Sequence, residues 1–511
     1  MPGPTHPEPP TDSGALIQRS VRALKWSYIG AAARIVLQIA SQIVLARLLG
    51  PAAYGTVTAA VLVILIAGIA VELGLGPALV RAPKLEAADV RAAFTRVALA
   101  ALGMSAIIIA GADAVALLFD EPQVAAVLRW MTLAMVCQAL GAVSLGLLRR
   151  RLDFKTIQIA QVASYFVGFF LIGVSCAWLG AGVWSLVAAW VSQTFVASVI
   201  QYAKTRHEIA PRLRSGPAPL AAFGLSTVVA SFANWSVENV DNVLVGRAFG
   251  TSTLGAYSIS YSLLRTPVNH IVFSLQQVIM PFTARAQDDP ETMRKAYLAT
   301  LWAVAIVTMP TFLGLGALAP TAIDALYGSA WSEAIPLLVP LALAMPLQAV
   351  QAVGGPVLWG SGQVGREIRV TVSVVALLVV MLLIASTISA VAMAWSVLAA
   401  YLVRSVWITA KVSTLIGLRL GQSLSMLRGG LLVGLLVAAL LYGANAALDY
   451  AGAAPPVRLG AAVMLGAVLL PLLVLALMRV ILPPQLAELM RALLGRSPPR
   501  IQAWLGRRLA V

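Results

Sequence analysis

The chain has 511 residues, of which 60% are hydrophobic and 11% are charged, so its apolar content exceeds the roughly 45 to 50% of soluble domains. This composition excludes an ordinary soluble enzyme, and apolar runs of about 20 residues indicate helices that cross a membrane. The net charge of +16 would favour nucleic acid only if it formed a basic face on a soluble domain, so we expect no nucleic-acid partner.

Fourteen apolar runs follow one another along the chain. They must be helices, because a single segment in lipid can satisfy its backbone hydrogen bonds only internally. With ends good to about four residues, we place them at 27–48, 55–80, 94–119, 124–148, 156–178, 182–203, 219–246, 251–283, 296–318, 330–358, 370–387, 389–410, 429–448 and 457–482. The predicted fold class is all-α integral membrane, and the short connections leave no room for a catalytic domain, so we expect no enzyme.

Basic side chains gather at one set of connections. When the connections are assigned alternately to two sides, most of the 36 Lys and Arg residues fall on the side of the amino terminus. The other side holds Arg47, Arg247 and Arg458, and the spans themselves contain Arg34, Arg129, Arg265 and Arg404. By the positive-inside rule, both termini are predicted to be cytoplasmic.

A short pattern recurs with an offset of 200 residues. Residues 46–50 (Ala-Arg-Leu-Leu-Gly) precede Gly55, and residues 246–250 (Gly-Arg-Ala-Phe-Gly) precede Gly255. Both copies lie at the outer turn between the first two helices of a candidate repeat. We therefore predict two pseudo-symmetric six-helix bundles, parallel in orientation and related by an axis along the membrane normal, with two extra C-terminal helices.

The predicted domains follow from this repeat and from the composition of the ends. The amino-terminal segment is rich in Pro and polar residues, which favours disorder, and the carboxyl-terminal segment has leucines at helical spacing with interleaved arginines, which favours a helix at a lipid surface. The domains are a disordered cytoplasmic tail (1–26), an N-terminal six-helix bundle (27–203), a cytoplasmic linker (204–218), a C-terminal six-helix bundle (219–410), an extra helix pair (429–482) and a cytoplasmic amphipathic tail (485–511).

Several stretches carry a resemblance to a known family. Residues 46–55 (Ala-Arg-Leu-Leu-Gly-Pro-Ala-Ala-Tyr-Gly) and 72–80 (Glu-Leu-Gly-Leu-Gly-Pro-Ala-Leu-Val) are similar to the opening helices of the Wzx-type polysaccharide flippases, the polysaccharide transporter branch of the MOP superfamily. Further similar stretches are 149–155, 180–187, 241–247 and 254–257. Together they span most of the first eight predicted helices.

The resemblance implies translocation of undecaprenyl-pyrophosphate-linked oligosaccharide repeat units across the bacterial cell inner membrane, by alternating access. The product would serve exopolysaccharide, capsule or O-antigen (lipopolysaccharide) synthesis, with membrane lipids and the polysaccharide polymerase and export machinery as further partners. No phosphate-binding G-x-x-x-x-G-K-[ST] loop is present, so no ATP hydrolysis is expected. No cofactor is implied beyond H+ or Na+ as a coupling ion.

Two alternatives stay open at this point. A lipid II flippase also has fourteen helices in the same superfamily. A MATE-like cation-coupled drug exporter normally has twelve helices and an acidic cavity, so the two extra helices and Arg265 count against it.

Cations inside the spans are candidates to neutralise a pyrophosphate, because an unpaired charge in the roughly 30 Å hydrocarbon core costs several kcal/mol or more. Arg265 and His270 lie near the middle of the eighth span. Arg34 and Arg404 lie nearer the inner ends of theirs. We predict that all four bind the substrate pyrophosphate, with neutral packing as the alternative for His270 and snorkelling to the interface as the alternative for Arg404.

Four residues are candidates for ion coupling or gating: Glu72, Glu238, Asp241 and Asn234. Glu72 matches Arg34 in depth, so the two would form either a fixed ion pair or one that the pyrophosphate displaces. Asn234 and Glu238 share a helix face with Asn242 at i, i+4 and i+8, where their oxygens would hold a proton or a sodium ion. A helix-capping and interhelical hydrogen-bond cluster is the alternative.

The two cysteines suggest no metal or redox site, and the tryptophans suggest contacts at the membrane interface. Cys137 and Cys176 lie in separate spans, where a thiol is a small hydrophobic group, and no metal-ligand spacing is present. Seven tryptophans tend to flank span ends and are mostly predicted to anchor the helices at the membrane interface, with stacking on sugars as the alternative for some of them: Trp178, Trp184, Trp190, Trp302, Trp331, Trp359 and Trp395.

Overall fold

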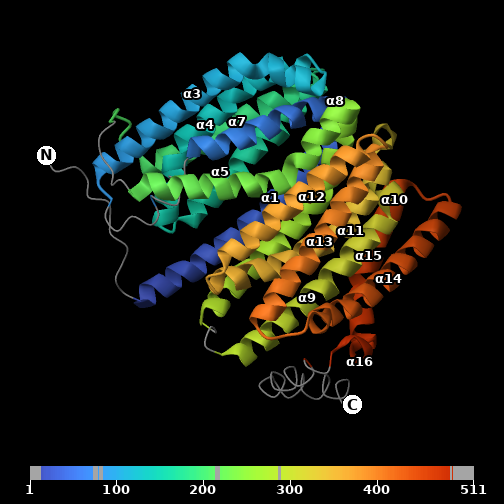
Figure 1. Cartoon of the computed structure of the whole chain (residues 1–511). Coiled ribbons are helices and arrows are strands. Elements are labelled where there is room, and N and C mark those ends of the chain that lie inside the picture. The colour runs from blue at the N-terminus through green and yellow to red at the C-terminus, as the bar shows by residue number, and fades with distance from the viewer. Residues whose placement is uncertain are drawn as a thin grey trace. The chain divides into compact units, whose positions relative to one another are not determined.

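The computed structural model describes residues 13–72, 79, 85–212, 219–285, 289–483 and 486. For residues 13–29, 31, 72, 219–231, 233, 270–285, 364 and 479 this description is limited to the backbone. The described ranges contain helices, turns and short connections and no strand (Figure 1). The all-α prediction is therefore confirmed.

The helices follow one another with short connections. They are α1 (Ser13–Glu72), α3 (Ala87–Phe119), α4 (Gln123–Arg150), α5 (Phe154–Tyr165), the π-helix η1 (Phe166–Gly173), α6 (Val174–Trp178), α7 (Trp184–Thr205), α8 (Pro219–Arg285), α9 (Pro290–Ala317), α10 (Ala319–Leu326), the 3-10 helix η2 (Ser329–Trp331), α11 (Ala334–Gly360), α12 (Val364–Ala385), α13 (Ala390–Leu415), α14 (Leu420–Tyr450), α15 (Pro455–Ala476) and α16 (Met478–Ile481).

Eleven helical segments of the described chain are long and apolar enough to cross a membrane, so the integral membrane character is confirmed. The predicted count of fourteen is not reproduced one for one. The long helix α1 covers the first predicted span and residues 55–72 of the second, and α8, which covers the seventh and eighth, is not among these eleven. The span predicted at 156–178 is divided into α5, η1 and α6.

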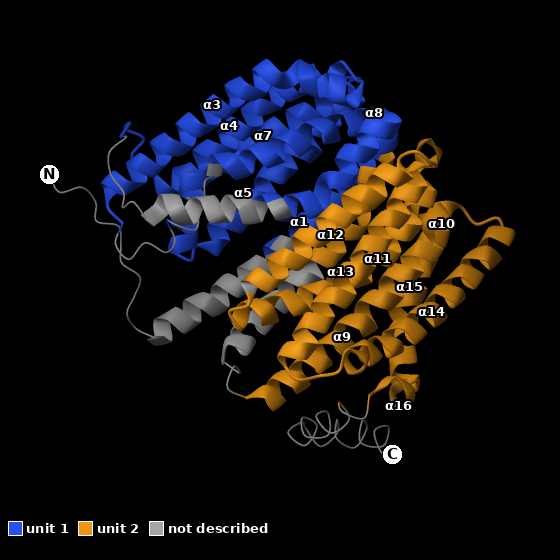
Figure 2. Ribbon diagram, viewed as in Figure 1, with its two compact units in different colours: residues 1–255 blue, residues 256–511 orange. Residues whose placement is uncertain are grey.

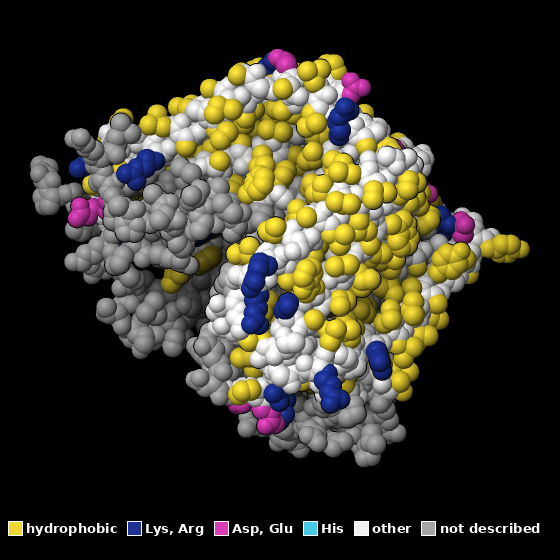
Figure 3. Space-filling view, in the orientation of Figure 1, with side chains coloured by type: hydrophobic (Ala, Val, Ile, Leu, Met, Phe, Trp, Pro, Cys, Tyr) yellow, Lys and Arg dark blue, Asp and Glu magenta, His cyan; other side chains and the backbone are white. Residues whose placement is uncertain are grey.

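Apolar side chains cover much of the outer surface, as the space-filling view shows for one face (Figure 3). On α15, for example, Val463 and Met464 are 62% and 69% exposed. A soluble monomer rarely exposes such contiguous apolar surface. These side chains therefore face lipid.

The sequence repeat is a repeat of backbone conformation. Gly50 interrupts α1 with φ 74° and ψ 176°, and Gly250 interrupts α8 with φ 81° and ψ 177°. A side chain is strongly disfavoured at positive φ, so glycine is the residue that allows each long helix to turn here. The offset of 200 residues thus identifies two equivalent kinks.

The chain divides into two compact units, residues 1–255 and 256–511 (Figure 2). The helix α8 contributes to both, with its first part in unit 1. The predicted domain boundaries stay a prediction: α1 begins within the segment 1–26 expected as a tail, and of the amphipathic tail 485–511 only Leu486 lies in the described chain.

Unit 1 is built on one apolar core. Its buried members come from α1, α3, α4 and α7, and include Val57, Ile108, Leu128 and Leu186. Leu254, in the first part of α8, belongs to the same cluster. The core therefore joins the helices of the first repeat to the second kinked turn.

In unit 2, the extra helix α14 packs on α9 through glycine. A Cβ added to Gly430 would lie 2.5 Å from the carbonyl carbon and oxygen of Ala305, and one added to Gly434 would lie 3.1 Å from the carbonyl carbon of Met309. Small residues four apart let two membrane helices approach at backbone distance. A second apolar cluster, with Val433, Val437 and Ala462, continues this contact to α15.

Candidate functional site

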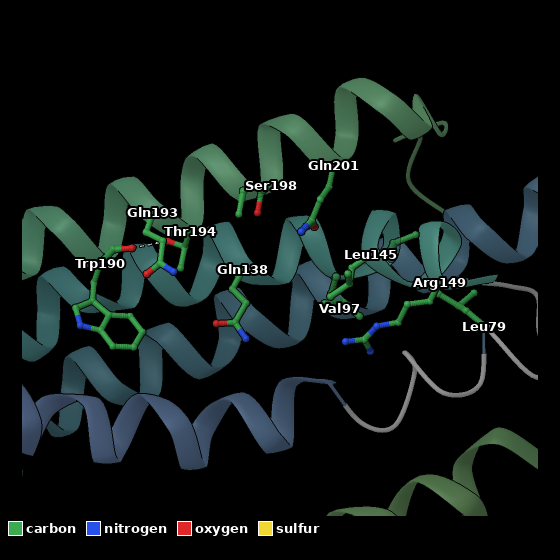
Figure 4. Close-up of a pocket in the computed structure, with 15 residues that line it drawn as sticks. Leu79, Val97, Gln138, Leu145, Arg149, Trp190, Gln193, Thr194, Ser198 and Gln201 are labelled. Atoms are coloured by element: carbon green, nitrogen blue, oxygen red, sulfur yellow. Dashed lines mark hydrogen bonds between the residues drawn. The ribbon is translucent and has the colours of Figure 1, made fainter. Parts of the chain in front are cut away.

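A cavity of about 300 Å³ lies in unit 1 between α4 and α7 (Figure 4). This volume is at the lower end of the range usual for small-ligand sites. In Figure 4, Trp190 and Arg149 lie at opposite ends of the cavity and Gln138 lies between them. The cavity therefore runs along the two helices.

Polar side chains from both helices line this cavity. Gln138 and Arg149 come from α4, and Gln193, Thr194, Ser198 and Gln201 come from α7. Among the described residues that line it, Arg149 is the one charged side chain. The cavity thus offers amides and hydroxyls along its length and a guanidinium at one end.

Close packing holds α4 and α7 together beside the cavity. The Ser198 hydroxyl donates to the carbonyl oxygen of Cys137 at 2.6 Å, and the Thr205 hydroxyl donates to the Ser144 hydroxyl at 3.0 Å. A Cβ on Gly141 would lie 2.4 Å from Ser198 Oγ. The register of the two helices is fixed by these contacts, so the polar residues of one face those of the other.

A second cavity of about 160 Å³ adjoins the first in unit 1. It shares Gln138, Trp190 and Thr194 with the first cavity, and the rest of its described lining is apolar apart from glycine. Met131 and Met135 of α4 lie there opposite residues of α1. Trp190 therefore stands between a polar space and an apolar one.

Trp190 is held by aromatic contacts with the π-helix. The Phe169 ring lies edge-on to Trp190 at 5.9 Å, and Tyr165 stacks on Phe169 at 4.6 Å. The Ser41 hydroxyl of α1 donates to the Tyr165 hydroxyl at 3.4 Å. The prediction that Trp190 is an interfacial anchor does not hold, because it lies six residues inside α7 and lines the cavities.

Arg34 also belongs to the contact between α1 and α5. Its Nη1 donates to Gln161 Oε1 at 3.1 Å, and Gln161 lies one turn before Tyr165. The proposed partner Glu72 ends the described part of α1, and its side chain lies outside the described residues. The ion pair between Arg34 and Glu72 therefore stays a prediction.

Arg265 lies in unit 2 above an aromatic ring. Its Cζ is 5.7 Å from the centre of the Tyr261 ring, a cation–π distance, and the Tyr261 and Tyr401 hydroxyls are 2.6 Å apart in a buried hydrogen bond. Gln351 Nε2 donates to the carbonyl oxygen of Tyr401 at 3.0 Å. The side chain of His270 lies outside the described residues.

Arg404 lies one turn after Tyr401 on α13. Its Nη2 donates to the Thr371 hydroxyl of α12 at 3.3 Å, and its buried Nε has no hydrogen-bond partner in the described chain. A neutral hydroxyl does not balance the charge of a guanidinium. Arg404 therefore keeps capacity for an anion.

The polar residues of α8 differ in exposure along the predicted face. Asn234 is exposed, Glu238 is half-buried and Asn242 is buried. Asp241 is 2% exposed, and its Oδ1 accepts from the backbone and side-chain N–H groups of Asn242, at 2.8 Å and 3.1 Å. These bonds join neighbouring residues inside α8 and cap no helix end, so ion coupling at the four residues and the hydrogen-bond alternative both stay predictions.

The described residues contain no group of three His, Cys, Asp or Glu side chains placed to hold a metal ion. Both cysteines are free thiols. The cavity itself offers a ligand hydrogen bonds, an aromatic face and a guanidinium group.

Comparison with known proteins identifies the family. The family described as Polysaccharide biosynthesis protein matches residues 44–336, which is more than half of the chain. The chain belongs to this polysaccharide biosynthesis family. The matched region contains both kinked turns and the cavity between α4 and α7.

Relatives with biosynthetic names are found in several bacteria. The chain is 29% identical over 361 residues to the succinoglycan biosynthesis transport protein ExoT of Rhizobium meliloti, covering 69% of this chain and 71% of that protein. It is 22% identical over 359 residues to the lipopolysaccharide biosynthesis protein WzxC of Escherichia coli, covering 67% and 70%.

Solved structures share the fold. A lipid II flippase, MurJ, in an inward closed conformation aligns with a TM-score of 0.67 at 10% identity, over 90% of this chain and all of that chain. An inward-facing multidrug MATE transporter of the MOP superfamily aligns with a TM-score of 0.56 at 16% identity, over 75% and 98%. At these identities the likeness concerns the fold alone.

Proposed function

We propose that the chain is a flippase that translocates undecaprenyl-pyrophosphate-linked oligosaccharide repeat units across the bacterial inner membrane by alternating access, with both termini in the cytoplasm. The polysaccharide biosynthesis family, the transport protein among its relatives and the fold shared with a lipid flippase support this proposal. The chain acts as a transporter without a chemical step.

The observation that carries the proposal is the position of Arg265. It lies well inside α8 and is held over the Tyr261 ring, which is itself fixed by Tyr401. A guanidinium at membrane depth offsets part of the cost of moving an anionic headgroup through hydrocarbon. A pyrophosphate headgroup is the anion that a polysaccharide biosynthesis protein would carry through this region.

In this proposal the role of each intramembrane cation depends on its depth in the membrane. Arg34 and Arg404 lie nearer the predicted cytoplasmic ends of their helices and receive the pyrophosphate, whereas Arg265 and His270 neutralise it at mid-membrane. Glu72, Glu238, Asp241 and Asn234 serve coupling to H+ or Na+ or the gating of the helices. The polymerase and export machinery would take up the product.

Reconstitution tests this function directly. Full-length protein in liposomes that contain a fluorescent polyprenyl-pyrophosphate glycan should speed the movement of the glycan between leaflets, measured as protection from an external lectin. Arg265→Ala should abolish the effect, whereas Arg129→Ala, which breaks an exposed ion pair with Asp113, should retain it. Export of a cationic drug without glycan movement would overturn the proposal, and transfer of lipid II alone would favour that alternative.

A further inference from the structure

The cavity between α4 and α7 reaches from one helix end to mid-membrane. Gln138 lies twelve residues before the end of α4 at Arg150, and Gln193 lies twelve residues before the end of α7 at Thr205. At 1.5 Å per residue each amide is about 18 Å from its helix end. Arg149 and Gln201 lie near those ends, which the positive-inside rule places at the cytoplasmic surface.

The lining favours a neutral, hydroxyl-rich ligand. Glutamine amides both donate and accept hydrogen bonds, and the serine and threonine hydroxyls do the same, so they match the hydroxyl groups of a sugar. Gln138 is exposed to the cavity although it lies in the middle of an apolar helix. The described lining contains no carboxylate, so it offers no counter-charge to an organic cation.

Trp190 supplies a rigid apolar face at the deep end. Its ring is fixed by Phe169, and Phe169 by Tyr165, so little side-chain freedom is lost when a ligand packs on it. The C–H face of a pyranose ring is apolar and packs well on an indole. The π-helix therefore positions Trp190 at this site through Phe169, and π-helical segments are frequent at functional sites.

Arg149 supplies the charge at the other end. It is exposed and lines the cavity, and it has no hydrogen bond or ion pair of its side chain among the described residues. Its neighbour Arg150 is engaged with the carbonyl oxygen of Leu79 at 3.2 Å. A planar guanidinium free to form paired hydrogen bonds is suited to a phosphate.

We infer that the cavity between α4 and α7 is a loading subsite for the headgroup, in which Arg149 binds the pyrophosphate and Gln138, Gln193 and Trp190 bind the first sugar. The inference rests on the proposed function for its ligand class. The deep end takes an uncharged sugar, because no second charge lines it in the described chain. Arg265 belongs to unit 2 and is not among the residues that line this cavity.

Binding to the full-length protein in lipid nanodiscs tests this subsite. The probes are farnesyl pyrophosphate and farnesyl pyrophosphate esterified with glucose, galactose or N-acetylglucosamine. At least one sugar ester should bind more tightly than farnesyl pyrophosphate. Arg149→Gln should weaken binding of all probes about tenfold, as expected for the loss of a charged hydrogen bond, and Arg366→Gln, an exposed arginine at the start of α12, should leave binding unchanged.

The deep end is tested by its own variants. Trp190→Leu and Gln193→Ala should each remove the advantage of the sugar ester, a loss of about three- to tenfold for an aromatic face, and should leave farnesyl pyrophosphate binding unchanged. Equal binding of all four probes by the wild-type protein overturns the sugar subsite. Equal binding by wild type and Arg149→Gln overturns the phosphate assignment.

Cysteine labelling gives a measurement that does not depend on the folding of these variants. In a Cys137→Ser, Cys176→Ser background, Ala197→Cys, at a residue that lines the cavity, should react with a maleimide and be protected by the sugar ester, whereas Arg366→Cys should react equally with and without it. Unprotected Ala197→Cys contradicts the inference. If wild-type protein binds these probes but moves no glycan lipid, the proposed function fails and the subsite stands; if the variants move glycan lipid and bind as wild type does, the subsite fails alone.

Discussion

Gly55 packs against the turn that precedes Gly255, and Gly255 packs against the turn that precedes Gly55. A Cβ on Gly55 would lie 1.6 Å from the carbonyl oxygen of Thr251, and a Cβ on Gly255 would lie 2.0 Å from the carbonyl oxygen of Pro51. Each added Cβ would also meet the backbone nitrogen of the other glycine, at 2.9 Å and 3.0 Å. The two copies of the repeated turn are therefore in backbone contact within unit 1.

Substitution at this contact should destabilise the protein. Gly55→Ala places a methyl group against backbone that no rotamer change can move, and such overpacking costs about 1–3 kcal/mol. Gly68→Ala, with no atom within 4 Å of its Cβ, is the matched control. Thermal unfolding of the full-length protein in detergent should show a lower Tm for Gly55→Ala and Gly255→Ala, and a Tm equal to that of Gly68→Ala would contradict the close contact.

The hydrogen bond between Tyr261 and Tyr401 should affect glycan translocation, because it fixes the ring on which Arg265 lies. Tyr401→Phe removes the hydroxyl bonded to Tyr261 and leaves that buried group without its 2.6 Å partner, at a cost of about 1–3 kcal/mol. We expect slower glycan translocation in liposomes, because the ring beneath Arg265 is freed. Tyr442→Phe, on an exposed side chain, is the control, and unchanged rates in Tyr401→Phe would show that the ring needs no support.

A large side chain in place of Gly430 should disrupt the packing of α14 on α9. Gly430→Leu would drive a side chain into the backbone at Ala305, whereas a Cβ on Gly443 of the same helix meets nothing within 4 Å, so Gly443→Leu is the control. We expect Gly430→Leu to make the connection after α13 more sensitive to limited proteolysis and to lower the Tm. Identical cleavage patterns in the two variants would refute this packing.

Asp289 should stabilise the start of α9 in a pH-dependent way. Its carboxylate accepts from the hydroxyl and then from the backbone N–H of Thr292, and these hydrogen bonds, the hydroxyl's first, lower the pKa of Asp289. A lowered pKa means that the contribution is present above the unfolded value of about 3.9 and is lost as pH falls through the folded value. The Tm difference between wild type and Thr292→Val should therefore shrink in strong acid, and a constant difference would contradict the cap.

Hydropathy predicts the helices, because each segment in lipid must satisfy its own backbone hydrogen bonds. The repeat is predicted by the equal spacing of arginine and glycine in its two copies, because Gly50 and Gly250 are needed where φ is positive. The cavity was missed for a different reason. Gln138 and Gln193 lie on separate helices, and their meeting depends on the register set by Gly141 and Ser198, which no single segment contains.

For some residues the sequence predicts the correct helix but not the correct surroundings of the side chain. Trp331, predicted as an interfacial anchor, is 0% exposed in the interior of unit 2. Arg265 was predicted from depth alone, whereas its aromatic support by Tyr261 joins it to α13 through Tyr401. Depth along a helix follows from sequence, but the direction in which a side chain leaves the helix depends on its neighbours.

The reciprocal glycine contact limits how far the two copies of the turn can differ in sequence. When a side chain grows on one surface of most helix pairs, a smaller one opposite can make room for it. Gly55 and Gly255 already carry only hydrogen, and an added Cβ on either would meet the main chain of the other copy. A larger residue at one position therefore cannot be accommodated by a smaller residue at the other, and we expect the two positions to tolerate only glycine as a pair.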